Sequence, residues 1–435
     1  MAASDPANAA MLDQRVARPV SPRRRVVRLP RGVLRYGQAL GPTGIALALQ
    51  FVTFAITARG LGVIAFGLYA TVTALAAILI ELIGCGISDV LVRGVARDAK
   101  SFPRHFGQML VAFAATFPPV LLAGAGLLML GGGLAMPFAV ALIGLAGEMI
   151  AARFAASTES ILVAHGDMPG AALVRVVTAL TRLVSALCFF AVARALGLWV
   201  WVVLAQSIVL ALGLCLYVAC RYGRPRFVWS AHDFRAGPAF AVNQTARALQ
   251  GNIDRLVLAG FADPAALGAY AAGARLLVVG LFPIQVLTRM LYPEFFRRGV
   301  SGIAATRAYA RSQVPAMLAT GLAAFAAVAT AAQILPHVLG HDFAGSRQAA
   351  VLLAGALPLI GLQYLAADTL TGAGHQGLRA ALAIGASIGS GLLMLGGVQV
   401  LGGVNGVVAG FLAGHALFLV VLIVASRLVA LRTAP

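Results

Sequence analysis

The sequence carries little charge for its length. Of its 435 residues only 11% are charged, whereas 60% are hydrophobic. A soluble domain of this size would need far more charge to cover its surface, so the composition excludes an ordinary water-soluble protein. Residues 1–35 are polar, proline-containing and basic, and they lack the short apolar core and small-residue cleavage site of a secretory signal. We therefore expect lipid to be the solvent and the apolar spans themselves to drive insertion.

Lysine and cysteine are also scarce. Lys100 is the only lysine, and a Walker phosphate-binding loop is absent, which excludes an ATPase subunit of that kind. The four cysteines lie in or at the ends of apolar runs, without a paired spacing: Cys85, Cys188, Cys215 and Cys220. We interpret them as small core residues. Neither a disulfide framework nor a metal site is indicated, and no cofactor is expected.

Long hydrophobic runs, in contrast, fill most of the chain. A hydrocarbon core of about 30 Å takes roughly 20 apolar residues of helix. We therefore predict an all-α, polytopic membrane protein with twelve transmembrane helices. The predicted spans are 38–58, 68–92, 107–130, 137–164, 170–193, 197–220, 238–261, 265–290, 310–331, 346–370, 376–399 and 403–426.

Most basic residues lie on one side of the predicted membrane. If residues 1–35 are cytoplasmic, the inside segments hold 24 of the 33 arginines and lysines, the outside loops hold three, and six lie inside spans. This positive-inside bias places both termini in the cytoplasm, with attraction to anionic phospholipid as a secondary effect. No basic platform interleaved with aromatic residues is present, so the net charge of +19 does not predict nucleic-acid binding.

The chain is expected to divide into two bundles of six helices. The predicted divisions are a basic, disordered tail at 1–35, an N-terminal bundle at 36–221, a cytoplasmic linker at 222–237, a C-terminal bundle at 238–427 and a tail at 428–435. Gly67-Leu68-Tyr69-Ala70 recurs as Gly268-Ala269-Tyr270-Ala271, an offset of 201, and the same offset pairs Arg97 with Arg298. An even number of spans in each half gives both repeats one orientation, as in transporters whose halves are related by an axis along the membrane normal. The substrate path would then lie between the halves.

Several longer segments match a known family in order and spacing. They are Thr57-Ala58-Arg59-Gly60-Leu61-Gly62, Phe66-Gly67-Leu68-Tyr69-Ala70, Asn252-Ile253-Asp254-Arg255-Leu256, Leu267-Gly268-Ala269-Tyr270-Ala271, Arg275-Leu276, Tyr292-Pro293 with Arg297 and Arg298, and Leu339-Gly340-His341-Asp342-Phe343. Through these segments most of residues 38–426 resembles the polysaccharide transport family. This family comprises the O-antigen and exopolysaccharide flippases of the multidrug/oligosaccharidyl-lipid/polysaccharide exporter superfamily.

The resemblance implies a fold, a cargo and partners. The fold would be two six-helix bundles around a V-shaped central cavity that opens to one side of a bacterial inner membrane at a time. The cargo would be an undecaprenyl-diphosphate-linked oligosaccharide, and H⁺ or Na⁺ would couple its movement. A polysaccharide polymerase and chain-length proteins would be further partners. Some relatives have fourteen spans rather than twelve, the extra pair being peripheral.

The six arginines inside predicted spans are the main functional candidates. An ionisable group at the bilayer centre costs about 2.5–3.5 kcal/mol on insertion scales, so it tends to face a watery cavity or a partner. Arg175 and Arg182 lie two helical turns apart and would form one cationic stripe. Guanidinium groups bind phosphate oxygens bidentately, so this stripe suits a diphosphate. Pairing of both arginines with Glu148 or Glu159 of the preceding span is an equal alternative.

A second polar face is predicted on span 7. Asn243, Arg247 and Asp254 follow helical spacing there, and amide side chains can hydrogen-bond sugar hydroxyls. Together with the family-like segments, this face completes the predicted cargo-binding set: Arg153, Arg175, Arg182, Asn243, Arg247, Asn252, Arg255 and Arg275. The structural alternative is an ion pair of Asp254 with Arg275 or Arg255 that fixes spans 7 and 8 together.

Coupling to an ion requires a group that changes charge. The candidates inside or at the ends of spans are Asp89, Asp254, Glu148, Glu159 and Asp368, of which Asp254 and Asp89 are favoured, and Glu81 in the middle of span 2 is a comparable candidate. Asp89 has a structural alternative as well, because Arg93 follows it at i+4 on the same helix face. The sequence does not choose among these residues.

Three functions remain to be distinguished. A secondary transporter or flippase for polyprenol-linked glycan agrees with the intramembrane arginines, because its cargo is anionic, and it would work by alternating access. A multidrug or metabolite antiporter on the same fold would favour an apolar, aromatic cavity with few fixed cations. An integral glycosyltransferase or polymerase would need a long outer loop with carboxylates or histidines for acid–base chemistry. The longest predicted outer loop is only residues 332–345, so we expect a transporter and not an enzyme.

Overall fold

The computed structural model describes residues 31–130, 136–192, 194–228 and 237–432. Most of the predicted basic tail and half of the predicted linker therefore lie outside the described residues. The chain forms two compact units, Met1–Gly41 and Pro42–Pro435. All contacts discussed below lie within the second unit, and the described part of the first unit is the beginning of α1.

The described residues fold into helices joined by short connections. The helices are α1 (Arg31–Leu79), η2 (Ile80–Leu82), α2 (Ile87–Arg97), η3 (Ala99–Ser101), α3 (Phe102–Leu130), α4 (Phe138–Ala164), α5 (Met168–Val192), α6 (Leu196–Tyr222), α8 (Pro238–Phe261), α9 (Pro264–Gly299), α10 (Ile303–Leu339), η4 (His341–Phe343), α11 (Gly345–Ala354), α12 (Ala356–Gly372), α13 (Gln376–Leu401) and α14 (Gly403–Arg432). The all-α fold of a polytopic membrane protein is thereby confirmed.

Ten helical segments of the described chain are long and apolar enough to cross a membrane. The first of them, Gly44–Leu82, contains residues from both the first and the second predicted span. α8 is not among the ten, because amide, carboxylate and guanidinium side chains lower its hydropathy. It is nevertheless 24 residues long and coincides with the seventh predicted span. Every predicted span therefore corresponds to a helical segment.

Several predicted boundaries were wrong. Residues 59–67, predicted as an outer loop, are helical except at Gly62, whose φ of 74° and ψ of 169° bend α1 at that one residue. Glycine reaches this conformation readily because it has no Cβ. Span 2, predicted as one helix, breaks between η2 and α2 at residues 83–86. Span 10 is divided at Gly355 into α11 and α12.

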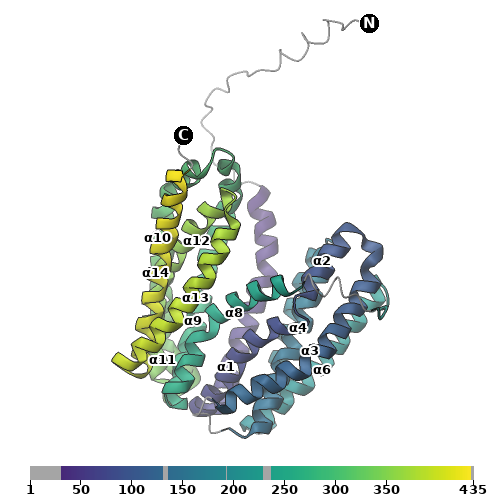
Figure 1. Ribbon diagram of the computed structural model, residues 1–435. Helices are drawn as coiled ribbons and strands as arrows, with labels where there is room; N and C mark the ends of the chain where they lie inside the picture. Colours follow the sequence, from purple (N-terminus) through teal and green to yellow (C-terminus); the bar gives the residue numbers. More distant parts are fainter. Residues whose placement is uncertain (1–30, 131–135, 193, 229–236, 433–435) are drawn as a thin grey trace, which may run out of the picture. The chain divides into compact units, whose positions relative to one another are not determined.

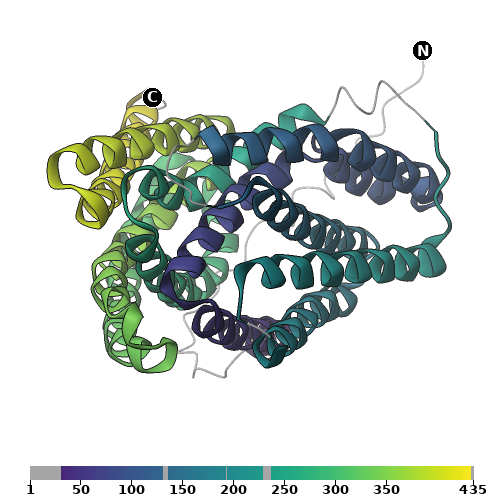
Figure 2. The ribbon, with the colours of Figure 1, turned by 90° about the horizontal axis from the view of Figure 1, so that it is seen from below.

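Helices of each half pack mainly against one another. In the first half α4 contacts α3, α5 and α6; in the second half α9 contacts α10, α11 and α12, and α13 contacts α14. In Figure 1, α2, α3, α4 and α6 stand on one side and α9 to α14 on the other, and Figure 2 shows the same grouping from below. α8 belongs to the second half by sequence but also contacts η2 of the first.

The largest hydrophobic cluster joins the two halves. It contains fully buried Trp199 from the first half and fully buried Tyr270 from the second. A Cβ atom on Gly67 would overlap the carbonyl oxygen of Pro264, and a Cβ on Gly268 would overlap the carbonyl oxygen of Val63. Val63 and Pro264, like Gly67 and Gly268, differ by 201. The repeated tetrapeptides thus pack reciprocally against each other, as a two-fold relation between the halves requires.

Candidate functional site between the two halves

A small pocket lies beside this reciprocal contact. One wall consists of Phe66, Tyr69, Ala70 and Thr73 from α1, and the other consists of Arg255 from α8 with Ala271 and Arg275 from α9. Both halves therefore contribute to it, and the second half supplies its two cationic side chains. Positions 69–70 and 271 belong to the repeated tetrapeptides, so the repeat places these walls next to the contact between the halves.

Neither arginine of the pocket has an acidic partner among the residues that the structure describes. Arg255 Nη1 donates to Asn252 Oδ1 at 3.2 Å, and its Nε is buried without a hydrogen-bond partner. The Arg275 guanidinium is repelled by those of Arg255 and Arg182 and attracted by the Glu148 carboxylate, with which it forms no ion pair. Two adjacent cations of this kind, on a wall between the halves, provide a place for an anion.

Asp254 does not form the ion pair that was one predicted alternative. Its side chain is 7% exposed, and Oδ2 accepts a hydrogen bond from the Tyr270 hydroxyl at 2.7 Å. Its other oxygen, Oδ1, has no hydrogen-bond partner. Asp254 is bonded to Tyr270, and it forms no ion pair with the neighbouring Arg255 or Arg275.

The arginines of α5, in contrast, are paired with carboxylates of α4. Arg182 donates to Glu148 and to the Tyr69 hydroxyl, which also donates to Glu148. Arg175 Nε donates to Glu159 Oε2 at 2.6 Å. The pairing of α5 with α4 anticipated as an alternative is therefore present. It neutralises the predicted cationic stripe, although Tyr69 connects the Arg182 pair to the pocket wall.

Arg153, Arg247 and Asn252 are not among the residues that line this pocket, although Asn252 accepts a hydrogen bond from Arg255. Arg153 is 7% exposed on α4 and forms an ion pair with Glu81 at 3.8 Å. Arg247 is exposed and donates to Gln244 at 3.4 Å, while Asn252 donates to the carbonyl oxygen of Ala248 at 2.9 Å. Asn243 is on α8, but its side chain lies outside what the structure describes.

Five residues of the pocket wall were not predicted as site residues: Phe66, Tyr69, Ala70, Thr73 and Ala271. All of them except Thr73 belong to the family-like segments at residues 66–70 and 267–271. The signal that could have identified them is the tetrapeptide repeat. A repeat that lies on the axis between two similar halves must line the interface between them.

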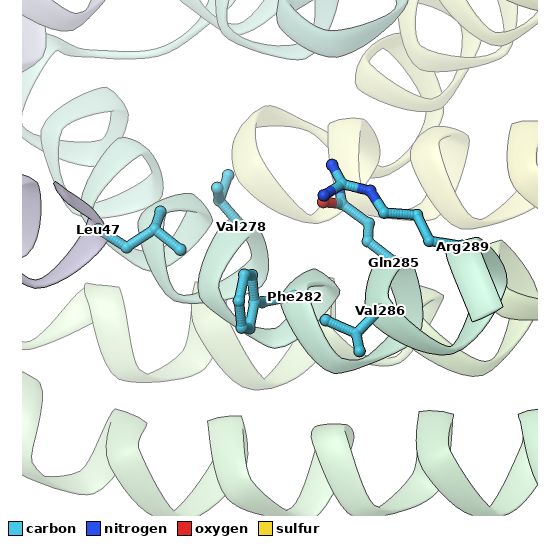
Figure 3. A pocket seen from close by; sticks show the side chains of 6 residues that line it. All are labelled: Leu47, Val278, Phe282, Gln285, Val286 and Arg289. Atoms are coloured by element: carbon cyan, nitrogen blue, oxygen red, sulfur yellow. The ribbon is translucent and has the colours of Figure 1, made fainter. Parts of the chain in front are cut away.

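A second pocket lies between α1 and α9. Leu47 from α1 and Val278, Phe282 and Val286 from α9 form its apolar part. Gln285 and Arg289 of α9 supply its polar part, as Figure 3 shows. An apolar groove that ends in a guanidinium has the chemistry to hold an amphiphile with an anionic head.

The family model for polysaccharide biosynthesis proteins matches residues 41–298. This is more than half of the chain and includes both pocket walls. The chain belongs to the polysaccharide biosynthesis protein family. The predicted relation to polysaccharide exporters is therefore confirmed. No curated protein matches the chain.

Solved transporter structures share the fold of this family member. A MATE transporter in complex with MaL6 aligns at a TM-score of 0.60 and 17% identity, covering 90% of this chain and 95% of that one. An outward-facing multidrug resistance MATE transporter of the MOP superfamily aligns at 0.57 and 18%, covering 90% and 94%. A MOP superfamily transporter from Pyrococcus furiosus, whose binding pocket is described as having reverse polarity, aligns at 0.59 and 18%, covering 89% and 93%. At these identities the likeness establishes the fold alone, which this chain shares with those transporters.

The acidic residues predicted to couple an ion fall into two groups in this family member. Glu148 and Glu159 are each paired with an arginine of α5. Asp254 has only the Tyr270 hydroxyl, and Asp89 has no ion pair with Arg93 or with any other described residue. The predicted alternative for Asp89, a pair with Arg93 along the helix, is therefore not formed.

Proposed function

We propose that this family member is a flippase. It would move an undecaprenyl-diphosphate-linked oligosaccharide from the cytoplasmic to the periplasmic leaflet of a bacterial inner membrane, by ion-coupled alternating access and with both chain termini in the cytoplasm. The observation that carries the proposal is the pair Arg255 and Arg275, which line one pocket between the halves without an acidic partner among the described residues. A diphosphate supplies the negative charge that these two cations lack.

The second pocket supports a lipid-linked cargo. Its apolar walls come from helices of opposite halves, and Arg289 lies at its polar part. A polyprenyl chain can remain among apolar side chains of such a groove while a phosphate contacts the guanidinium. The head-group would then pass between the halves while the tail stays in the bilayer, so no covalent chemistry is required.

The antiporter alternative predicts a different ligand charge. Most cationic drugs would be repelled by Arg255 and Arg275, whereas an anionic head-group is attracted. Binding of a polyprenyl diphosphate therefore separates the two functions more sharply than growth in the presence of drugs.

The proposal is tested by thermal unfolding of the purified chain in detergent with undecaprenyl diphosphate or with uncharged undecaprenol. We expect the diphosphate alone to raise the Tm of the wild type, because it binds only the folded state. The double variant Arg255→Ala/Arg275→Ala should lose this rise, while Arg194→Ala, a change at an exposed arginine, should retain it. Equal stabilisation of the wild type by both lipids would remove the basis of the proposal.

Transport is tested in a bacterial host whose own glycan flippase has been deleted. The wild-type chain should restore surface polysaccharide, and the double alanine variant should not, although it inserts normally. Arg255→Lys/Arg275→Lys retains both charges but not the bidentate geometry, so it should restore export only in part. Full export by the double alanine variant would contradict the assigned roles.

A further inference from the structure

The second membrane span is broken in one half of the molecule only. Between η2 and α2 the residues Gly84, Cys85 and Gly86 all have positive φ, of 74°, 45° and 78°. In the other half, the offset of 201 places the corresponding residues 284–287 inside α9, which is continuous from Pro264 to Gly299. An L-residue such as Cys85 adopts the left-handed region only at an energetic cost. The break is thus a specific feature of the first half, and transporters commonly bind ions where a membrane helix is interrupted.

Arg153 of α4 bridges this break. Its Nη1 lies 3.8 Å from Glu81 Oε2, before the break, and its Nη2 donates to Ser88 Oγ at 2.9 Å, after the break. Ser88 Oγ lies 3.3 Å from Ser157 Oγ of α4. The guanidinium is 7% exposed and its Nε has no hydrogen-bond partner. We call Glu81, Ser88, Asp89, Arg153 and Ser157 the span-2 cluster.

The span-2 cluster has one more acidic than basic group. Arg153 interacts electrostatically with both Glu81 and Asp89, and these two carboxyl groups interact with each other. Glu81 and Asp89 are each partly buried. With both carboxyl groups ionised, the cluster would hold one uncompensated negative charge in a medium of low dielectric constant, which is costly. Uptake of one cation removes that charge.

Other titratable or charged groups near the cluster come from the elements that pack against it. Those on α2, α3, α4, α8 and the turn are Arg93, Arg97, Arg104, His105, Glu148, Glu159, Arg247, Asp254, Arg255 and Cys85. Glu148 and Glu159 have their own arginines, and Asp254 bonds Tyr270. His105 lies against Gly94, farther along α2.

The break also contacts the first helix of the other half. A Cβ on Gly86 would overlap the carbonyl oxygen of Gly237, and a Cβ on Gly237 would overlap that of Cys85. Gly237 immediately precedes α8, the helix that carries Arg255 of the central pocket. A change of charge in the span-2 cluster therefore acts on a turn that touches the start of the cargo-binding helix.

We propose that the span-2 cluster takes up the proton that couples transport, as one proton held by the carboxyl group of either Glu81 or Asp89, and that the turn at residues 83–86 transmits this change to α8. The coupling role rests on the proposed function, whereas the proton uptake itself does not. A proton is favoured over a metal ion because the Arg153 guanidinium already contacts Glu81 and Ser88 and interacts with Asp89, so it would repel a second fixed cation there.

The test is infrared difference spectroscopy of the purified full chain in liposomes of phosphatidylethanolamine and phosphatidylglycerol, compared at pH 8 and pH 5.5. We expect a carbonyl band of a newly protonated carboxyl group in the wild type. The variant Glu81→Gln/Asp89→Asn should lose about one carboxyl per chain from this band, since the pair takes up a single proton. Glu294→Gln, which removes a carboxylate paired with Arg297 and Arg298 near the C-terminal end of α9, should keep the cluster's contribution. An unchanged band in the double variant would overturn the proposal.

Hydrogen exchange of the same samples tests the connection to α8. After correction for intrinsic exchange rates, residues 237–250 should change protection between the two pH values in the wild type and not in the double variant. The same change on adding sodium at constant pH would overturn the assignment of the proton. If the double variant does not insert, the single variants Glu81→Gln and Asp89→Asn replace it, and at least one of them must lose the carbonyl band. A band at full strength in both single variants would refute proton uptake by this pair.

Neither measurement contains the glycan lipid, so the proton site and the cargo can fail separately. A chain that protonates at this cluster but does not bind undecaprenyl diphosphate would overturn the proposed function and leave the proton site standing. Binding of the diphosphate without protonation at the cluster would overturn the proton site and leave the assignment of the cargo standing.

Discussion

Replacement of Arg182 distinguishes a structural from a cargo-binding role for the α5 arginines. Arg182 donates to Glu148 and Tyr69, and its guanidinium lies 5.4 Å from the centroid of the Trp199 ring. The side chains of Arg182 and Glu148 are 21% and 17% exposed, so little water would replace a lost partner. In Arg182→Met the Glu148 carboxylate would remain buried without its cation.

The expected loss follows from these contacts. Breaking a buried ion pair by removing one partner costs about 3–5 kcal/mol, and partial exposure favours the lower end. Loss of the contact with the Trp199 ring adds about 0.5–1 kcal/mol. We therefore expect Arg182→Met to lower the free energy of unfolding by about 3–4 kcal/mol. The double variant Arg182→Met/Glu148→Gln, which leaves no buried charge, should lose only about 1–2 kcal/mol, which is about 2 kcal/mol less than Arg182→Met alone. Glu148→Gln alone completes the cycle that gives the coupling energy between the two sites.

The assay is reversible unfolding in mixed micelles, followed by glycan export in the flippase-deficient host. If Arg182 is structural, the double variant should recover both stability and export. Recovery of stability without export would show that Arg182 contacts the cargo. A coupling energy near zero would refute the reasoning, because it would mean that the pair contributes nothing to the packing of α5 on α4.

Three further perturbations test other parts of the structure. Gly67→Val should reduce export by at least about tenfold, because its side chain would push Pro264 and Gly268 away and prevent the halves from closing. Gly126→Val, at a glycine with no atom within 4 Å of its Cβ position, should export normally. Equal export by both variants would contradict the reciprocal contact. Arg289→Leu should weaken binding of undecaprenyl phosphate by roughly 10-fold, the equivalent of about 1.4 kcal/mol for one charge-assisted contact, as measured by titration in detergent; unchanged affinity would exclude the α1–α9 groove as a phosphate site. Cys85→Val should lower the free energy of unfolding by about 1 kcal/mol or more, since a β-branched residue is disfavoured at positive φ, whereas Cys188→Val on exposed α5 should have no comparable effect.

The break in span 2 was beyond prediction from the sequence. Residues 68–92 form one apolar stretch of the length expected for a span, and isolated glycines such as Gly84 and Gly86 are common in membrane helices. The bend at Gly62 was missed for a related reason: one residue with positive φ redirects the chain, whereas sequence patterns lead one to expect a loop of several residues. Such positions depend on backbone dihedrals that have no signature in hydropathy.

The sequence also did not decide which charged side chains pair with each other. Arg182 and Arg255 both lie inside apolar spans. Arg182 forms an ion pair with Glu148, whereas Arg255 forms no ion pair with a described residue and donates a hydrogen bond to Asn252. Asp254 follows the pattern of an ion pair but turns to Tyr270, the counterpart of Tyr69 in the repeat. Helical spacing tells which residues share a face, but it does not tell which face of a neighbouring helix lies opposite.

The sequence by itself determined that the chain is a helical membrane protein of a polysaccharide exporter family, and it predicted two similar halves. These conclusions come from properties that are local or additive along the chain: hydrophobic length, the one-sided distribution of arginine and the repeat at an offset of 201. Such properties predict how a chain crosses a bilayer without knowledge of its tertiary contacts. Only the tertiary structure decided which arginines are neutralised and which remain available between the halves. That distinction depends on distances of a few ångströms between residues far apart in the chain, because a charge in a medium of low dielectric constant is governed by its nearest partner.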